Sequence, residues 1–224
     1  RQNAETLTCV GCGPIGRGCL DAIATVLPNL KRVVCNNRSP ANAMALAEHV
    51  ERDLGLTAVV EPELETAVRQ ADVLSIAVSR TAPLHLKREW VQPGCTLLAS
   101  GPFQCDEALW LDMKIVLDNT ALHQTYVQEG KENHDPAYGN HIGTPIYQLI
   151  DAGKLPSLEA FPTLGKIILG EQGGRTGEEE ILCFINDGMA IFDMGLCHDL
   201  YETALEQGIG QKLVLWDSAA QCAE

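Results

Sequence analysis

The sequence lacks long apolar runs and an excess of basic residues. No stretch approaches the roughly 20 consecutive apolar residues that a membrane-spanning helix needs. Its 224 residues contain 16 Lys and Arg against 30 Asp and Glu, a net charge of −14, which argues against binding to nucleic acid or to an anionic membrane. Hydrophobic residues make up 46% and charged residues 21% of the chain, so disorder is excluded and a soluble globular protein is predicted.

The sequence also lacks an apolar leader and an even number of cysteines. Nine cysteines, from Cys9 to Cys222, lie mostly within apolar segments, where free thiols act as small hydrophobic groups. A reducing cytoplasm is therefore the expected compartment. Cys9 and Cys12 form a C-x-x-C pair, the spacing of some redox and zinc sites, but no second pair follows at ligand spacing. We therefore expect no metal site.

The first two-thirds of the chain alternates strand-like and helix-like segments. Short apolar strands separated by helices indicate a parallel sheet covered on both faces, hence an α/β, doubly wound Rossmann-type fold. Ser39 is a plausible N-cap for a helix that begins at Pro40. The predicted strands are residues 6–10, 32–35, 58–60, 72–78, 96–99 and 114–117, and the predicted helices are residues 15–27, 40–54 and 63–70.

The last third is less regular. Residues 130–143 read as a loop, in which His134 and His141 are either exposed side chains or proton donors to a substrate. Further predictions are helices at 145–152 and 157–169, a glycine-rich turn at 170–177, a strand at 180–184 and an amphipathic helix at 189–206. Arg175 is expected to support nearby carbonyl groups. We predict one domain over residues 1–224, with helices at its C-terminal end.

A G-x-G-x-x-G motif lies between the first predicted strand and the first predicted helix. The first glycine permits a tight turn, the second lets the backbone approach a pyrophosphate, and the third lets the helix pack on the strand. The strand before it, the helix after it and the end of a second strand about 20 residues later together predict a dinucleotide site. Its residues are Gly11, Gly13, Pro14, Ile15 and Gly16.

The end of the second strand bears on the choice between NAD and NADP. An NAD site normally carries a carboxylate there for the ribose 2′-hydroxyl, whereas NADP sites use neutral and basic groups. This chain has Asn37, Arg38 and Ser39 instead, which favours NADP(H) over NAD(H). Arg38 would face the 2′-phosphate, and Asn37 and Ser39 would donate hydrogen bonds to it. The alternative is a solvated arginine beside a helix cap.

Several later motifs, in this order, carry a family resemblance. They are Ala71-Asp72-Val73 leading to Ala77-Val78-Ser79, Trp90 to Gly94, Leu164-Gly165, Gly174-Arg175-Thr176, Glu179-Glu180-Ile181, Gly188 to Asp193, Tyr201-Glu202 with Ala204, and Gly208-Ile209-Gly210. With the glycine turn, they make the whole chain resemble the ornithine cyclodeaminase/mu-crystallin family.

The resemblance implies a Rossmann domain that binds NAD(P)(H), with Ala77, Val78 and Ser79 lining the ribose and nicotinamide side. It also implies an N-terminal segment that forms the substrate pocket and a homodimer interface together with the C-terminal helices. The chain starts at Arg1, where the Rossmann domain of the family starts. We therefore expect that the N-terminal segment is missing here and that this portion alone is inactive.

Two positions depart from the pattern of the cyclodeaminases. The cyclodeaminases carry Gly-Gly-Asp after the fifth strand, and this chain has Phe103 where that aspartate would be. A phenyl ring cannot transfer a proton, which argues against cyclodeaminase activity on ornithine. We assign Phe103 to the substrate pocket. Asp187 stands where the family usually has a small apolar residue near the nicotinamide. Asp187 is thus our candidate catalytic acid/base; the alternative is that it caps a helix beginning near Gly188.

The resulting prediction is an NAD(P)(H)-dependent oxidoreductase of an amino acid or cyclic imine, of the ketimine reductase or amino-acid dehydrogenase type. One alternative is an ornithine cyclodeaminase that uses NAD catalytically. Another is an NADPH-binding protein without catalytic activity, which an apolar wall at Phe103 would also suit.

Overall fold

The computed structural model describes residues 2–79 and 84–213, so Arg1 and Cys222 lie outside the described residues. The chain divides into two compact units, Arg1–Gly188 and Met189–Glu224. Each unit is described by itself. The predicted single domain over residues 1–224 stays a prediction.

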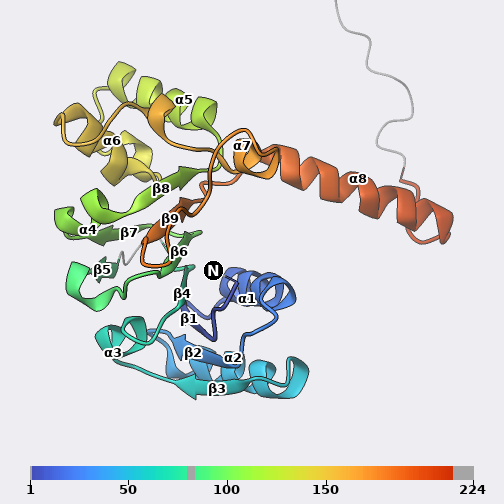
Figure 1. Ribbon diagram of the computed structural model, residues 1–224. Coiled ribbons are helices and arrows are strands. Elements are labelled where there is room, and N and C mark those ends of the chain that lie inside the picture. Colours follow the sequence, from blue (N-terminus) through green and yellow to red (C-terminus); the bar gives the residue numbers. More distant parts are fainter. Residues whose placement is uncertain (1, 80–83, 214–224) are drawn as a thin grey trace, which may run out of the picture. The chain divides into compact units, whose positions relative to one another are not determined.

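The first unit is built on a seven-stranded sheet in which every pairing is parallel (Figure 1). The strand order is β3-β2-β1-β4-β6-β9-β8, and it reverses direction between β1 and β4. This arrangement confirms the predicted doubly wound Rossmann-type fold. The strands are β1 (Thr6–Val10), β2 (Arg32–Asn36), β3 (Thr57–Val60), β4 (Val73–Ile76), β6 (Thr96–Ala99), β8 (Lys114–Leu117) and β9 (Leu182–Ile185).

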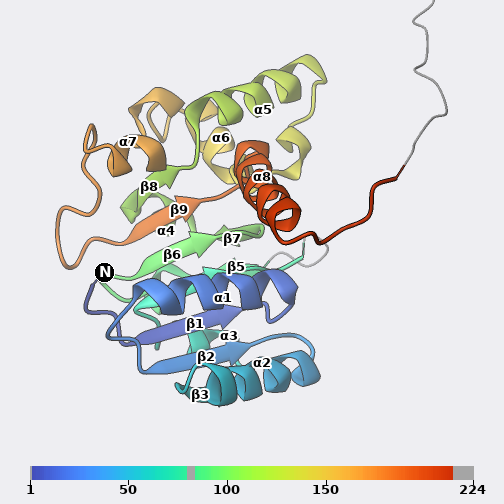
Figure 2. The ribbon, with the colours of Figure 1, turned by 90° about the vertical axis from the view of Figure 1, so that its right-hand side faces the viewer.

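Helices cover both faces of this sheet. Figures 1 and 2 show α1 (Pro14–Val26) and α2 (Pro40–Asp53) on one face, and α3 (Leu64–Val68) and α4 (Glu107–Asp112) on the other. Side chains along β1 alternate accordingly. Leu7 and Cys9 belong to the core cluster that includes residues of α1 and α2, whereas the buried Thr8 hydroxyl donates to the carbonyl oxygen of Ala67 on α3 at 3.0 Å.

The remaining elements of this unit differ in part from the sequence predictions. A small parallel sheet of β5 (Leu84–Leu86) and β7 (Phe103–Cys105) was not predicted. The helices are α5 (Thr120–Glu132), α6 (Thr144–Asp151) and α7 (Leu164–Ile168), with 3-10 turns at Arg88–Trp90, Tyr138–Asn140 and Leu158–Ala160.

The single helix predicted over residues 157–169 is wrong. The segment forms a 3-10 turn at Leu158–Ala160 and then α7, with Pro162 between them. Proline has no N–H for a helical hydrogen bond and disfavours helical geometry at the residue before it. The carbonyl oxygen of Pro162 instead accepts the N–H of Leu117 at 3.0 Å, which ties the segment to β8.

The second unit contains α8 (Ala190–Glu206), which is a helix as predicted but not an amphipathic one. Its apolar side chains do not gather on one side, and no residue of the helix is buried. Ile191, Phe192 and Leu200 are among the exposed side chains. Within residues 2–79 and 84–213, no helix combines the length and hydrophobicity needed to cross a membrane.

Arg175 and the cysteines have the predicted environments. Arg175 donates hydrogen bonds to the carbonyl oxygens of Glu180 and Cys95, which confirms its carbonyl-binding role. All eight cysteines that the structure describes carry free thiols, and most are buried.

A buried histidine, His49, joins α1 to α2. Its Nε2 lies 2.6 Å from Oδ1 of Asp21 on α1, and its Nδ1 lies 2.7 Å from Oδ2 of Asp53 on α2. The hydrogen bonds to Asp21 and Asp53 raise the pKa of His49 above its ordinary value, although burial and the guanidinium of Arg17 act in the opposite direction. The protonated ring therefore stabilises the packing of the two helices.

Substituting His49→Gln is expected to lower the free energy of unfolding by about 1 kcal/mol near pH 6, and by less near pH 9. The pKa is higher in the folded state than the roughly 6.5 of the unfolded chain, so the stabilisation is complete below about pH 6.5. It is lost as the pH rises through the folded-state pKa. Urea unfolding at both pH values measures the difference.

The matched control is His85→Gln, because His85 forms an exposed pair with Asp106 at 2.9 Å. We expect a smaller effect there, since exposed ion pairs contribute little. An effect of His49→Gln that is equal near pH 6 and pH 9 would contradict the charged state assigned to His49.

Candidate functional site

A glycine turn between β1 and α1 forms the floor of a cleft. Gly11 follows the last residue of β1 and has a φ of +97°, in the left-handed region that favours glycine. A Cβ at Gly11 would overlap the carbonyl oxygen of Ala77, and a Cβ at Gly16 would overlap the carbonyl oxygen of Gly11. Glycine at both positions therefore allows β1, α1 and the end of β4 to pack backbone against backbone.

Gly13 differs from these two glycines because it faces open space. It is the N-cap of α1, and a Cβ built there would have no heavy atom within 4 Å apart from its chain neighbours. Pro14 begins the helix and Ile15 is exposed beside it. The first N–H groups of a helix and its partial positive charge favour an anion, so the open space at Gly13 fits a pyrophosphate.

A cavity of about 480 Å³ lies at the carboxyl ends of β1, β2 and β4. Its size lies within the range of small-molecule and cofactor sites. Pro14, Ile15 and Gly16 adjoin this cavity in the chain but do not line it. The lining includes eight of the predicted cofactor residues: Gly11, Gly13, Asn37, Arg38, Ser39, Ala77, Val78 and Ser79.

The loop after β2 borders the cavity without a carboxylate. Arg38 and Ser39 are exposed. The side chain of Asn37 accepts the N–H of Cys12 at 3.0 Å and donates to the carbonyl oxygen of Ser39 at 3.0 Å. Asn37 thus braces the loop against the glycine turn, a use that the sequence did not indicate.

The ends of β4, β6 and β9 continue this edge of the sheet. A Cβ at Gly101 would lie 2.5 Å from the carbonyl oxygen of Val78, so the backbone after β6 packs directly on the backbone after β4. Asn186, after β9, donates from its side chain to the hydroxyl of Ser100 at 3.3 Å. Residues 186–188 are therefore connected through residues 100–101 to the wall of the cleft.

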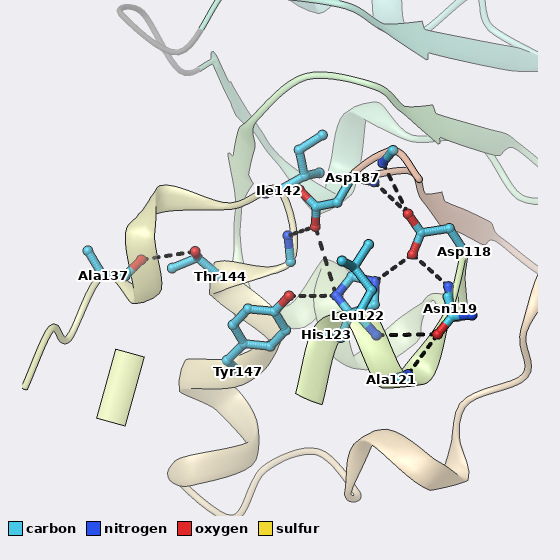
Figure 3. Close-up of polar contacts among 12 residues, drawn as sticks. Asp118, Asn119, Ala121, Leu122, His123, Ala137, Ile142, Thr144, Tyr147 and Asp187 are labelled. Carbon is cyan, nitrogen blue, oxygen red and sulfur yellow. Dashed lines mark hydrogen bonds and ion pairs between the residues drawn. The ribbon is translucent and has the colours of Figure 1, made fainter. Parts of the chain in front are cut away.

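Asp187 lies at the end of β9 with its side chain only 1% exposed. Its two carboxylate oxygens accept the N–H groups of Ile142 at 2.8 Å and Gly143 at 3.2 Å, just before α6 (Figure 3). The helix that follows Asp187 has Met189 as its N-cap, with no capping side-chain hydrogen bond. The alternative that Asp187 caps this helix is therefore wrong.

Three further buried side chains complete the polar cluster around Asp187, as Figure 3 shows. His123 on α5 approaches Asp118 through Nε2 at 2.9 Å, and its Nδ1 lies 2.5 Å from the hydroxyl of Tyr147 and 3.8 Å from Oδ2 of Asp187. Asp118 follows β8 and accepts the N–H groups of Asp187 at 2.9 Å and Gly188 at 3.2 Å. The cluster thus joins the ends of β8 and β9 to α5 and α6.

The hydrogen bonds of the cluster set its ionisation. Burial acts to raise the pKa of Asp118, but the hydrogen bond and charge of His123 and the N–H groups of Asn119 and Gly188 lower it below its ordinary value. Burial, together with the neighbouring Asp187 carboxylate, raises the pKa of Tyr147. Asp118 is therefore ionised and Tyr147 is a neutral hydroxyl at neutral pH.

Phe103, the predicted substrate-pocket residue, is buried in β7 and stacks on Trp110, with ring centroids 5.1 Å apart. It also borders a second cavity of about 430 Å³, whose lining includes Gln104 and His141. Its role in a substrate pocket stays a prediction.

The two loop histidines have different environments. His134 is exposed, whereas His141 is partly buried and stacks on Tyr126 with ring centroids 3.5 Å apart. Among the described residues, no group of three or more His, Cys, Asp or Glu side chains is placed to hold a metal ion.

Asp118, His123 and Tyr147 were missed in the sequence. Asp118 directly follows a predicted strand, a position typical of site residues in parallel sheets, and this was an available signal. His123 and Tyr147 lie within helices that carry no recognisable motif, so only the folded chain brings them together.

Known proteins similar to this chain include two oxidoreductases. Delta(1)-pyrroline-2-carboxylate reductase of Bacillus cereus (strain ATCC 14579) is 32% identical over 213 residues, which are 95% of this chain and 62% of that protein. Alanine dehydrogenase of Archaeoglobus fulgidus is 26% identical over 218 residues, 95% of this chain and 61% of that protein. The chain thus spans less than two-thirds of the length of either relative.

Solved structures share the fold. A Thermococcus litoralis Delta(1)-pyrroline-2-carboxylate reductase in complex with NADH and L-proline has a TM-score of 0.78 and 23% identity, covering 95% of this chain and 62% of that chain. An archaeal alanine dehydrogenase dimer with bound NAD has a TM-score of 0.76 and 27% identity, and the match covers 96% of this chain and 62% of that chain.

The ornithine cyclodeaminase/mu-crystallin family model matches residues 1–208, nearly the whole chain. This match confirms the resemblance found in the motifs. The chain belongs to the ornithine cyclodeaminase/mu-crystallin family.

Proposed function

We propose that this chain supplies the NAD(P)(H) site of an oxidoreductase that acts on a small amino acid or cyclic imine. The observation that carries the proposal is the cleft of about 480 Å³ where the strand order reverses, with a glycine floor that is open at Gly13. The Bacillus cereus relative is a reductase of a cyclic imine, and the archaeal alanine dehydrogenase structure contains NAD. Both support the proposal.

The residues of the cleft would bind and orient the cofactor. The backbone at Gly13, which lines the cleft, and at the adjoining Pro14 and Ile15 would hold the pyrophosphate at the start of α1, and residues 77–79 would line the ribose and nicotinamide side. A nicotinamide cofactor supplies or accepts the hydride at the carbon that bears nitrogen, and the protein contributes orientation and charge.

NADP(H) is the preferred cofactor in this proposal. Arg38 is exposed at the edge of the cleft, and no carboxylate lines the cleft in the described residues. A guanidinium group binds a 2′-phosphate through charge-assisted hydrogen bonds, whereas a carboxylate there would repel it.

Asp187 is proposed as the acid/base group, and Phe103 as a wall of the substrate pocket. Asp187 lies at the same edge of the sheet as the cleft, two residues beyond β9. Phe103 carries no proton to transfer, which disfavours ornithine cyclodeaminase chemistry. The homodimer formed through an N-terminal segment and the cytoplasmic location stay predictions.

The test of this function is turnover by the full-length protein. With a panel of cyclic imines that carry a carboxylate, we expect oxidation of NADPH, followed by absorbance at the nicotinamide band. Asp187→Asn is expected to lower kcat about 100-fold and to remove one limb of the pH profile, because a general acid/base group contributes on that scale.

Binding of NADPH without turnover of any imine would favour the non-catalytic alternative, and release of ammonia from ornithine with catalytic NAD would favour a cyclodeaminase. Unchanged turnover and an unchanged pH profile in Asp187→Asn would reject the acid/base role and leave Asp187 with its hydrogen bonds to Ile142 and Gly143.

Substituting Arg38→Ala is expected to weaken NADPH binding about tenfold to 100-fold, with a change below about threefold for NADH, because only NADPH carries the 2′-phosphate. Nucleotide fluorescence titration measures both affinities. Arg69→Ala, at the end of α3 and paired with Glu65, is the control and should change neither. Equal affinities of the unaltered protein for NADH and NADPH would contradict the assignment of Arg38.

A further inference from the structure

The loop that leads into α6 has an unfavourable backbone. His134, Tyr138 and Asn140 have φ values of 52°, 46° and 55°, in the left-handed region that residues with a side chain seldom adopt. Such a conformation costs roughly 1–2 kcal/mol per residue, so the surrounding contacts must impose it. The two carboxylate oxygens of Asp135, which accept the N–H groups of Ala137 and Gly139, supply some of these contacts.

The end of this loop is hydrogen-bonded to Asp187, two residues after β9. The N–H groups of Ile142 and Gly143 both donate to the carboxylate of Asp187. Glycine at position 143 lets the backbone pack closely against Tyr147 and His123, since a Cβ there would lie 2.6 Å from the hydroxyl of Tyr147 and 2.9 Å from Nδ1 of His123. The position of the loop therefore depends on the position of Asp187.

The position of Asp187 depends in turn on Asp118. One carboxylate oxygen of Asp118 accepts the N–H groups of Asp187 and Gly188, where Gly188 has a φ of +91°. The other accepts from Nε2 of His123. Asp118 thus fixes the turn after β9, and that turn is connected to the cleft by the hydrogen bond from Asn186 to Ser100.

His123 lies between the two carboxylates. Its ring is fully buried, with Nε2 on Asp118 and Nδ1 facing both Tyr147 and Asp187, and both aspartate side chains are 1% exposed (Figure 3). Two buried carboxylates without a cation or hydrogen-bond donor between them repel each other and lose solvation. The imidazole ring supplies a hydrogen-bond donor toward Asp118 and fills the space between the two carboxylates, with Nδ1 3.8 Å from Oδ2 of Asp187.

We propose that His123 is a positioning residue that couples the turn at residues 186–188 to the loop at residues 134–143. The turn is connected to the wall of the cleft by the hydrogen bond from Asn186 to Ser100, and the loop borders the second cavity beside Phe103. His123 touches neither proposed binding site and acts through Asp118 and Asp187. The expected effect of His123 on turnover rests on the proposed function, whereas the coupling between the turn and the loop does not.

Amide hydrogen exchange on the full-length protein tests the coupling without any substrate. His123→Gln is expected to raise exchange about tenfold in peptides that contain residues 142–143 and also in those that contain residues 187–188, because both pairs of N–H groups donate to carboxylates that His123 holds. Peptides from the glycine turn, residues 9–16, should change less than about twofold.

Tyr147→Phe is the matched control, since it removes the hydroxyl from Nδ1 of His123 but leaves both carboxylates in place. We expect exchange close to that of the unaltered protein. If His123→Gln does not fold, Asp187→Asn gives a second test. It replaces one of the two side-chain oxygens that accept the N–H groups of residues 142–143, and coupling through His123 predicts faster exchange at residue 188 as well.

A change in exchange confined to one of the two segments, or no change in either, would overturn the proposal.

Steady-state kinetics of the His123→Gln variant gives a second, independent measurement. If the proposed function holds, kcat of His123→Gln falls about tenfold while the Kd for NADPH stays within about threefold, a split that general unfolding would not give. If the unaltered protein turns over no substrate, the proposed function is refuted. The exchange experiment alone then decides whether His123 couples the two segments.

Discussion

The structure depends on close backbone packing at the carboxyl edge of the sheet. Gly11 packs on Ala77, Gly16 on Gly11 and Gly101 on Val78, each at a distance that a Cβ would prevent. These approaches bring the ends of β1, β4 and β6 together with the start of α1. The cleft exists because three side chains are absent, and the space left at Gly13 is what a pyrophosphate would fill.

A second constraint comes from the order of the strands. β9 comes late in the chain yet lies between β6 and β8, with Ile185 beside Leu117. The residues that follow β8 and β9 therefore lie close together, which brings Asp118 and Asp187 into one buried cluster with His123. The same arrangement carries the proposed coupling from α5 and the loop before α6 to the edge of the cleft.

Much of the first half of the fold was predictable because its signals are local. The glycine turn, the apolar strands and Ser39 before Pro40 define β1 to α2 within a few residues, and the boundaries of β1, β6 and β8 agree with prediction. The position of the cleft was predicted from the same glycine motif. The helix predicted over residues 157–169 failed because Pro162 interrupts it, a local signal that the prediction passed over; the contact of Pro162 with β8 was not visible in the sequence.

The polar cluster was predictable only in part. The unusual aspartate at 187 was visible in the sequence, but its hydrogen bonds to residues 142 and 143 join segments about 45 residues apart. No local pattern reports such a contact. The pairing of Asn37 with Cys12 was hidden for the same reason, since a loop asparagine is equally suited to binding a ligand.

The central claim is that the open space at Gly13 holds the dinucleotide. Gly13→Val in the full-length protein tests it directly, because a Cβ there has no heavy atom within 4 Å apart from its chain neighbours, and the backbone there is extended, with φ −81° and ψ −173°. Calorimetric titration with NADPH should show binding weakened at least about 100-fold, with the free energy of unfolding lowered by only about 1 kcal/mol, the scale of an N-cap substitution. Undiminished NADPH binding by this variant would contradict the account.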